Sequence, residues 1–263
     1  MRIFLVVTFI ASALVPFTAS QAYGNSNNNG DNTGTTTTPA SGACLPVPNV
    51  ISPQPAFNIN VSQLMTGKPW YSYILYGNPD KAPITMTNVI NYYDSLGRSS
   101  EPTRNVAAEV VIQEKVWSEG GACHDALEIS WFTVDGRQTG PYFVVAPNNT
   151  LIANSFDDSI LWATDGSTYA LFHNCDQRNP DTGNCKSTYI FVHSTIKPNT
   201  MTDSQKQTIA TAVNNALKPY CITVNDFQTY TWNDALGVCP QAVRENHPDC
   251  FKTIVNAYRL LLE

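Results

Sequence analysis

The chain has few charged residues, and basic residues in particular are scarce. Only 14% of its 263 residues are charged, and 15 lysines and arginines stand against 21 aspartates and glutamates. The resulting formal net charge of −6 argues against a nucleic acid or an anionic membrane surface as a partner, because both attract basic proteins. Apolar runs are also short, so we expect no integral membrane segment.

Sequence motifs of common catalytic and metal sites are missing. There is no HExxH helix, no Cys-x-x-Cys pair, no Gly-x-Ser-x-Gly elbow, no P-loop and no dinucleotide fingerprint. The carboxylates are spread along predicted strands rather than paired. The four histidines are scattered along the chain, at His124, His173, His193 and His247. We therefore expect no enzyme activity, no metal site and no bound cofactor.

The N-terminus indicates export. Met1 and Arg2 precede an apolar run over 3–15 that is too short to span a bilayer, and Ser20 and Ala22 are small residues suited to a cleavage site. We predict a signal peptide over 1–22 and a secreted, extracellular protein. All seven cysteines lie downstream, where an oxidising compartment favours disulfides. Because seven is odd, at least one thiol must be free, capped or paired with another molecule.

The remaining sequence divides into a linker, a folded domain and a tail. Residues 23–43 consist largely of Asn, Gly, Thr and Ser with almost nothing to bury, which predicts a disordered linker. A folded domain over 44–239 follows, and apolar residues at helical spacing predict a helical extension over 240–263. The sequons at Asn60 and Asn148 are candidate glycosylation sites in an exported chain.

Most of the folded domain has the composition of β-strands. Aromatic and β-branched residues are concentrated in short runs that turn-forming residues separate. The eight candidate strands are Trp70–Tyr76, Val106–Trp117, Ala126–Val134, Gly140–Val145, Ile152–Phe156, Ile160–Thr164, Tyr169–His173 and Thr188–Ser194. Their short connections favour an up-and-down barrel over a Greek-key sandwich, which has longer crossovers. The segment over 80–105 is long and poor in strand formers.

One clear helix follows the strands. Thr202 and Gln205 form a capping-box pattern, apolar residues then recur at helical spacing from Ile209 to Leu217, and Pro219 ends the run. Only one face of this helix is apolar, so we expect it to pack on the outside of the barrel. A further strand is predicted near Ile222–Tyr230.

Three segments resemble the signature motifs of the lipocalins. The first is Phe57–Tyr71, in which a glycine and Trp70 open the first strand. The second is the predicted hairpin Ser159–Cys175, and the third is Tyr189–Thr195. The similarity is closest to the branch of apolipoprotein D and the insect bilin-binding proteins, and it covers residues 44–239.

This resemblance implies an all-β, eight-stranded antiparallel barrel whose floor is Trp70. In the family an arginine at the end of the third motif packs over that tryptophan, whereas this chain has His193 or Ser194 there. Alternation along each strand sends one set of side chains into the barrel. We predict that the apolar set faces the ligand: Leu127, Ile129, Trp131, Ile160, Trp162 and Ile190. An amine ligand would need an inward carboxylate, for which Glu128 is the candidate.

The resemblance also implies two disulfides, Cys44–Cys175 and Cys123–Cys239. Cys185 precedes the last barrel strand, and Cys221 follows the helix that runs back along the barrel, so Cys185–Cys221 is a possible third bond. Cys250 is then left for a possible intermolecular contact.

The sequence therefore predicts a secreted carrier that binds or sequesters a small hydrophobic ligand, such as a lipid, a retinoid or a pigment, in the barrel cavity. One alternative is a protein-interaction, inhibitor or pigment-complex subunit whose barrel is filled by its own side chains. Another is a lipid-modifying enzyme on the same scaffold, which would need a reactive nucleophile or an acid–base pair inside the cavity. An open cavity separates the carrier from the filled barrel.

Overall fold

The computed structural model describes residues 44–48, 64–65, 68–77, 84–101, 105–134, 136–145, 151–178, 184–242 and 245. The predicted signal peptide, the linker, both sequons, Cys250, His247 and nearly all of the predicted helical extension lie outside these residues. In the part described, no helix is long and apolar enough to cross a membrane.

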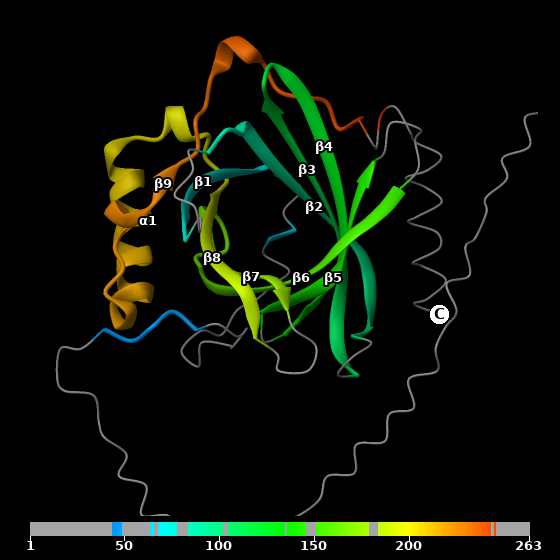
Figure 1. The fold of residues 1–263 in the computed structure, drawn as a ribbon. Coiled ribbons are helices and arrows are strands. Elements are labelled where there is room, and N and C mark those ends of the chain that lie inside the picture. The colour runs from blue at the N-terminus through cyan, green and yellow to red at the C-terminus, as the bar shows by residue number, and fades with distance from the viewer. Residues whose placement is uncertain are drawn as a thin grey trace, which may run out of the picture. The chain divides into compact units, whose positions relative to one another are not determined.

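A single antiparallel sheet closes on itself into a barrel (Figure 1). Its eight main strands are β1 (Trp70–Tyr76), β2 (Thr87–Glu101), β3 (Val106–Glu119), β4 (Ala122–Thr133), β5 (Arg137–Val145), β6 (Leu151–Thr164), β7 (Tyr169–Arg178) and β8 (Cys185–Ser194). Strands β2 to β8 pair in sequence order, β8 pairs with β1, and β1 pairs back to β2. The predicted fold, an eight-stranded up-and-down barrel, is confirmed.

The largest differences between the predicted and the observed strands concern β2 and β6. The sequence misses β2, which carries Asn, Asp, Gly and Ser residues of low strand propensity; pairing along nearly the whole of β3 holds it in place. The sequence also splits β6 in two at Asp157 and Asp158. These residues stay in the strand because they pair with Gly140 and Thr139 of β5. Tertiary pairing thus overrides local propensity at both places.

The turn between β6 and β7 is built as the hairpin prediction requires. The carboxylate of Asp165 accepts hydrogen bonds from the backbone N–H groups of Ser167, Thr168 and Tyr169, at 2.9, 2.7 and 3.2 Å. Gly166 has a φ of 73°, a conformation that most side chains avoid. This turn sets the register in which β6 and β7 pair.

Helix α1 (Asp203–Leu217) lies on the outside of the barrel (Figure 1). Thr202 and Gln205 form the predicted capping box. Ile209, Val213 and Leu217 of the helix are buried against a cluster of outward-facing barrel residues, which includes Ile74, Ile160, Trp162, Leu171, Ile190 and Val192. Beneath this helix, the outer face of the barrel is therefore as apolar as the core of a protein.

The strand predicted near Ile222–Tyr230 is much shorter in the structure. Thr223 and Asp226 cap a short 3-10 helix, η4 (Val224–Asp226), which takes up the first half of that segment. Only β9 (Gln228–Thr229) remains as a strand, and it pairs with β1.

The described cysteines form three disulfides, Cys44–Cys221, Cys123–Cys239 and Cys175–Cys185. The second joins the predicted partners, whereas the predicted Cys44–Cys175 and Cys185–Cys221 bonds are wrong. Cys175 and Cys185 lie on the paired strands β7 and β8, which brings them together locally. Leu45 N–H donates to the Pro219 carbonyl at 2.9 Å, so the N-terminal segment runs beside Cys221 instead.

Peptide mapping without reductant should recover these three bonds. The fragment with Cys44 should be joined to the one with Cys221, and cleavage between β7 and β8 should release no peptide unless the Cys175–Cys185 bond is reduced. Recovery of a Cys44–Cys175 peptide from native protein would contradict the structure.

Candidate ligand-binding cavity

One end of the barrel interior is closed by an apolar floor. Trp70 is fully buried there, and its ring N–H donates to the Leu64 carbonyl at 2.8 Å. The floor is completed by inward-facing side chains from several strands, namely Tyr93, Val111, Phe132, Leu161, Ala170 and Phe172. Side chains of the protein itself therefore fill this half of the barrel.

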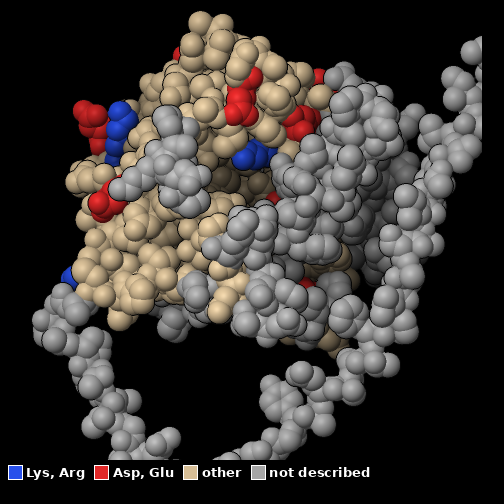
Figure 2. Space-filling view, in the orientation of Figure 1, with Lys and Arg blue, Asp and Glu red and all other residues tan. Residues whose placement is uncertain are grey.

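A cavity of about 220 Å³ remains above the floor. Aromatic and apolar side chains line part of it, among them Leu75, Tyr189, Phe191 and Tyr230. The other lining residues are mostly polar: Ser72, Asn91, Gln113, Lys115, Glu128, Gln138, Ser159, Asn174 and His193, with Ala126. Figure 2 shows a hollow in the described surface with basic side-chain atoms beside it.

Many of the polar lining residues belong to one hydrogen-bonded network, which we call the polar belt: Ser72, Asn91, Gln113, Glu128, Ser130, Gln138, Ser159 and His193. Gln138 joins several strands, because its Nε2 donates to Ser130 Oγ at 2.8 Å and to Glu128 Oε1 at 3.1 Å. The same nitrogen lies 3.3 Å from Gln113 Oε1, and Ser159 donates to Gln138 Oε1 at 3.0 Å. These contacts link β3, β4, β5 and β6 across the inside of the barrel.

The belt continues from β3 through β2 to β8. Gln113 Nε2 donates to Asn91 Oδ1 at 3.0 Å, and Asn91 Nδ2 lies 3.2 Å from Ser72 Oγ and 3.4 Å from His193 Nε2. Since an amide nitrogen only donates, His193 Nε2 must be the acceptor. The ring proton of His193 then sits on Nδ1, which lies 3.3 Å from the Tyr93 hydroxyl at the floor.

This direction of the hydrogen bonds determines what the belt offers to a ligand. Among the described residues, the amide nitrogens of Asn91 and Gln138 each make three contacts with only two hydrogens. The carbonyl oxygens of Asn91, Gln113 and Gln138 each accept one hydrogen bond in the belt and have a second acceptor position. The second hydrogen of Gln113 Nε2 and the hydroxyls of Ser72 and Ser130 can still donate, so the belt offers a ligand both acceptors and donors.

Burial changes the pKa values of the groups in and below the cavity. Burial, with a smaller contribution from the charge of Lys115, lowers the pKa of His193 to about 3. Burial raises the pKa of Tyr230 to about 12, and burial together with the charge of Glu128 raises the pKa of Tyr93 well above its usual value. At neutral pH the imidazole and both phenols are thus uncharged hydrogen-bonding groups.

The side chains predicted to face the ligand do not line this cavity. Alternation places Ala126 and Glu128 inside, so Leu127, Ile129 and Trp131 of the same strand point outward. Ile160, Trp162 and Ile190 also lie on the outer face, in the cluster under α1. Glu128 is among the lining residues.

The error has a physical cause. Alternation separates the two faces of a strand, but it does not say which face is inside. We assigned the more apolar face to the interior, whereas in β6 and β8 α1 buries that face on the outside. The polar set was visible in the sequence at alternate positions of other strands, including Gln113, Gln138 and Asn174, but no motif marked them.

No group of three or more histidine, cysteine, aspartate or glutamate side chains in the described part of the chain is arranged to hold a metal ion. His173, a buried residue on the outer face, stacks on Trp162 with ring centroids 4.4 Å apart. His193 belongs to the belt, and His124 stacks on Trp117.

No family model matches the sequence, and no curated protein matches it. Among solved structures, the chain is similar to insecticyanin from the tobacco hornworm Manduca sexta, with 16% identity over 74% of this chain and 89% of that one and a TM-score of 0.46. The tryptamine complex of the amine binding protein of Rhodnius prolixus gives 14% identity, coverage of 72% and 93%, and a TM-score of 0.47. The cockroach allergen Per a 4 gives 13% identity, coverage of 72% and 99%, and a TM-score of 0.45.

Proposed function

We propose that this chain is a binding protein that holds one small organic ligand inside the barrel. The observation that carries the proposal is the cavity of about 220 Å³, which lies between a closed floor and a wall of fixed polar groups. Fixed hydrogen-bonding groups beside apolar surface are typical of small-molecule sites. A belt whose members hold one another in place is ready to bind without further ordering.

The lining supports a ligand with two kinds of surface. An aromatic or apolar body would lie against Leu75, Tyr189, Phe191 and Tyr230. Groups that donate hydrogen bonds, such as hydroxyl, amide or amine N–H, would face the acceptors of the belt. The volume is below the roughly 300–1,000 Å³ of usual ligand pockets, which favours a compact molecule over a long-chain lipid.

The remaining features of the proposal concern compartment and activity. An exported protein is supported by the three disulfides, which form and persist in oxidising compartments. We propose that the protein acts by binding rather than by catalysis. The alternative of a barrel filled by its own side chains fits the floor but not the cavity above it.

Blocking the cavity tests this function. Leu75 lines the cavity and is half-buried, so Leu75→Trp should fill ligand space and weaken binding by about tenfold or more. Binding would be measured by calorimetry against a panel of small aromatic amines, phenols, amides and fatty acids. Val134→Trp is the matched control, because Val134 is 81% exposed in the turn after β4.

Two outcomes would count against the proposal. One is that no compound of the panel saturates the wild-type protein at one-to-one stoichiometry below about 100 μM. The other is that Leu75→Trp and Val134→Trp bind as the wild type does, which would place the bound compound elsewhere. Trp162→Phe adds a second control, because this buried outer-face residue should affect stability and not affinity.

A further inference from the structure

The barrel wall is incomplete between its first two strands. Among the described residues, β1 and β2 pair directly at two positions only, Trp70↔Asn91 and Tyr71↔Ile90. Beyond this point β1 continues along β8 as far as Tyr76, and β2 continues along β3 as far as Thr87. The two strands therefore diverge on the cavity side of the floor.

A C-terminal segment, residues 228–239, occupies this position, and we call it the strap. On one side Gln228 and Thr229 pair with β1, and Tyr230 N–H donates to the Tyr73 carbonyl at 2.9 Å. On the other side Thr231 forms a bridge to Thr87 of β2, and its carbonyl accepts from Asn88 N–H at 3.1 Å. The strap is thus hydrogen-bonded to both of the diverging strands.

Tyr230 is the residue that the strap contributes to the cavity. Its side chain is 8% exposed and lines the cavity together with Leu75, Asn91 and His193. The neighbouring Thr229 and Thr231 are exposed, as alternation along an extended segment requires. One aromatic ring from outside the eight main strands therefore completes the side wall.

Asn88 of β2 holds the strap in place. Its Nδ2 donates to the Asn233 carbonyl at 2.8 Å and to the Gly237 carbonyl at 2.6 Å, and its Oδ1 accepts from Asn233 N–H at 2.7 Å. Asn88 is fully buried and has a φ of 52°, the left-handed region that asparagine tolerates better than most residues. All hydrogen-bonding groups of one side chain are thus used to hold the strap backbone.

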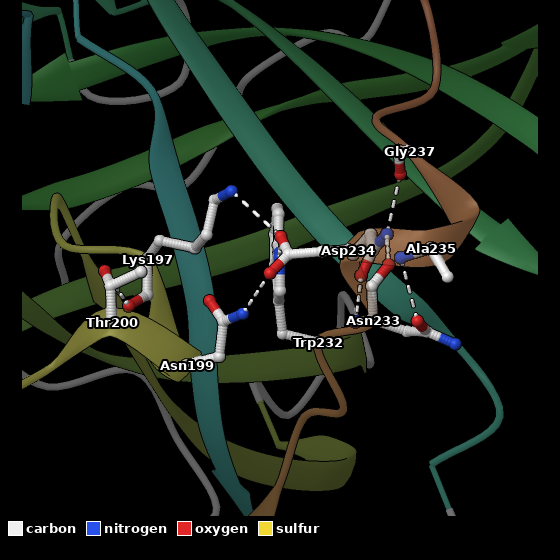
Figure 3. Close-up of polar contacts among 9 residues, drawn as sticks. Lys197, Asn199, Thr200, Trp232, Asn233, Asp234, Ala235 and Gly237 are labelled. Carbon is white, nitrogen blue, oxygen red and sulfur yellow. Dashed lines mark hydrogen bonds and ion pairs between the residues drawn. The ribbon is translucent and has the colours of Figure 1, made fainter.

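Two further contacts hold the strap at other points. Figure 3 shows Asp234 between the side chains of Trp232, Lys197 and Asn199, whose nitrogens lie 2.9, 3.1 and 2.6 Å from its carboxylate. These contacts are exposed and therefore weak individually. The disulfide Cys123–Cys239 then ties the end of the strap to β4.

We infer that Tyr230, held by the strap, closes the side wall of the cavity and determines which molecules enter it by size. This rests on the proposed function only in assuming that the cavity is the ligand site. Removing the ring opens a route through the wall, whereas loosening the strap at Asn88 lets the wall move as a unit. Besides Asn88, Tyr230 and the disulfide, the strap packs through half-buried Trp232, whose ring centroid lies 5.2 Å from that of Tyr71. Most of its other residues are exposed, so it should open more readily than the barrel strands.

The test uses a cysteine inside the cavity and needs no ligand. Ser72 lines the cavity and is 4% exposed, so Ser72→Cys places a thiol there with little change in shape. Its rate of modification is measured with N-ethylmaleimide and with the bulkier fluorescein maleimide, after subtracting the reaction of the parent protein. In the Ser72→Cys protein both reactions should be slow, and the bulkier reagent should be the slower one.

Adding Tyr230→Ala should speed modification by about tenfold or more and reduce the difference between the two reagents. Tyr230→Phe keeps the ring and should leave both rates as they are. Asn88→Gly removes the side-chain hydrogen bonds that hold the strap, and glycine adopts the positive φ without strain. This substitution should therefore speed both reactions and increase amide hydrogen exchange within 228–239. Thr202→Ala, which removes the capping hydrogen bonds to Gln205 of α1, is the control for general destabilisation.

Equal rates in the Tyr230→Ala and Tyr230→Phe proteins would overturn the inference. So would faster hydrogen exchange of the strap in Asn88→Gly without faster modification of the cavity thiol. If the rates change as expected but no compound binds the wild type, the proposed function fails and the inference on access stands. If a ligand binds the wild type and the rates do not change, the proposed function stands and the inference on access fails.

Discussion

Trp70→Ala should lower the free energy of unfolding by about 3–5 kcal/mol, the usual cost of removing a large buried aromatic side chain. The ring is fully buried in the floor of the barrel, among residues that β2, β3, β4, β6 and β7 supply. Its removal leaves a cavity that five separate strands would have to move to fill. It also leaves the Leu64 carbonyl without its donor, which adds to the loss.

Urea unfolding followed by far-UV circular dichroism would measure this effect. Trp70→Phe should recover part of the loss, because it keeps an aromatic ring but not the ring N–H. Trp131→Ala is the matched control, since Trp131 is only half-buried and lies on the outer face of β4. A loss below about 1 kcal/mol for Trp70→Ala would show that the floor does not depend on this residue.

Much of the fold follows from local sequence signals. The hairpin at Asp165 and the helix after Thr202 are specified by turn and capping residues, and both form as predicted. Strand β2 has no such signal, because its many polar residues disfavour a strand on their own. It exists because β3 offers a continuous row of backbone partners, which a single-segment argument does not contain.

The cavity was harder to predict than the barrel. The apolar face of β6 looks like an interior because it carries Ile160 and Trp162, yet α1 covers it from outside. The true interior is polar above the floor, where the side-chain amides of Gln138 and Asn91 are hydrogen-bonded within the polar belt. Such a network is invisible in a single strand, because its members come from strands far apart in the sequence.

The two wrong disulfide predictions failed for a related reason, because they did not take into account which strands pair. Cys175 and Cys185 are 10 residues apart, and their bond follows from the β7–β8 hairpin. The family resemblance instead suggested that Cys175 bonds to Cys44, whose partner in the structure is Cys221. Strand pairing was the better guide at this position.

Mild acid should destabilise the protein through two buried histidines. Burial lowers the pKa of His173 to about 4, with the backbone of Pro48 opposing the shift in part, and lowers the pKa of His193 to about 3. In the unfolded chain both titrate near pH 6.5. Below about pH 6.5 the unfolded state therefore binds more protons than the folded state. The stability that the two neutral histidines contribute is fully present above that pH and falls as the pH drops towards 4.

Each histidine should cost about 2 kcal/mol at pH 5, since each pKa unit is worth about 1.4 kcal/mol, so the pair should cost about 4 kcal/mol. The measurement is urea unfolding at about pH 7.5 and about pH 5 for the wild type and for a His173→Gln, His193→Gln double variant. The double variant should lose much less stability between the two values. His124→Gln, at an exposed position, should behave as the wild type does.

An equal loss in the wild type and the double variant would mean that carboxylates, not histidines, cause the acid sensitivity. The His193→Gln variant on its own separates the two sites. Protonated His193 can no longer accept from Asn91 Nδ2, so its titration breaks the belt, whereas His173 lies outside the cavity, where it stacks on Trp162. Because the pKa of His193 in the folded protein is about 3, ligand affinity should be unchanged at about pH 5 and should fall only near pH 3, through His193 and not through His173.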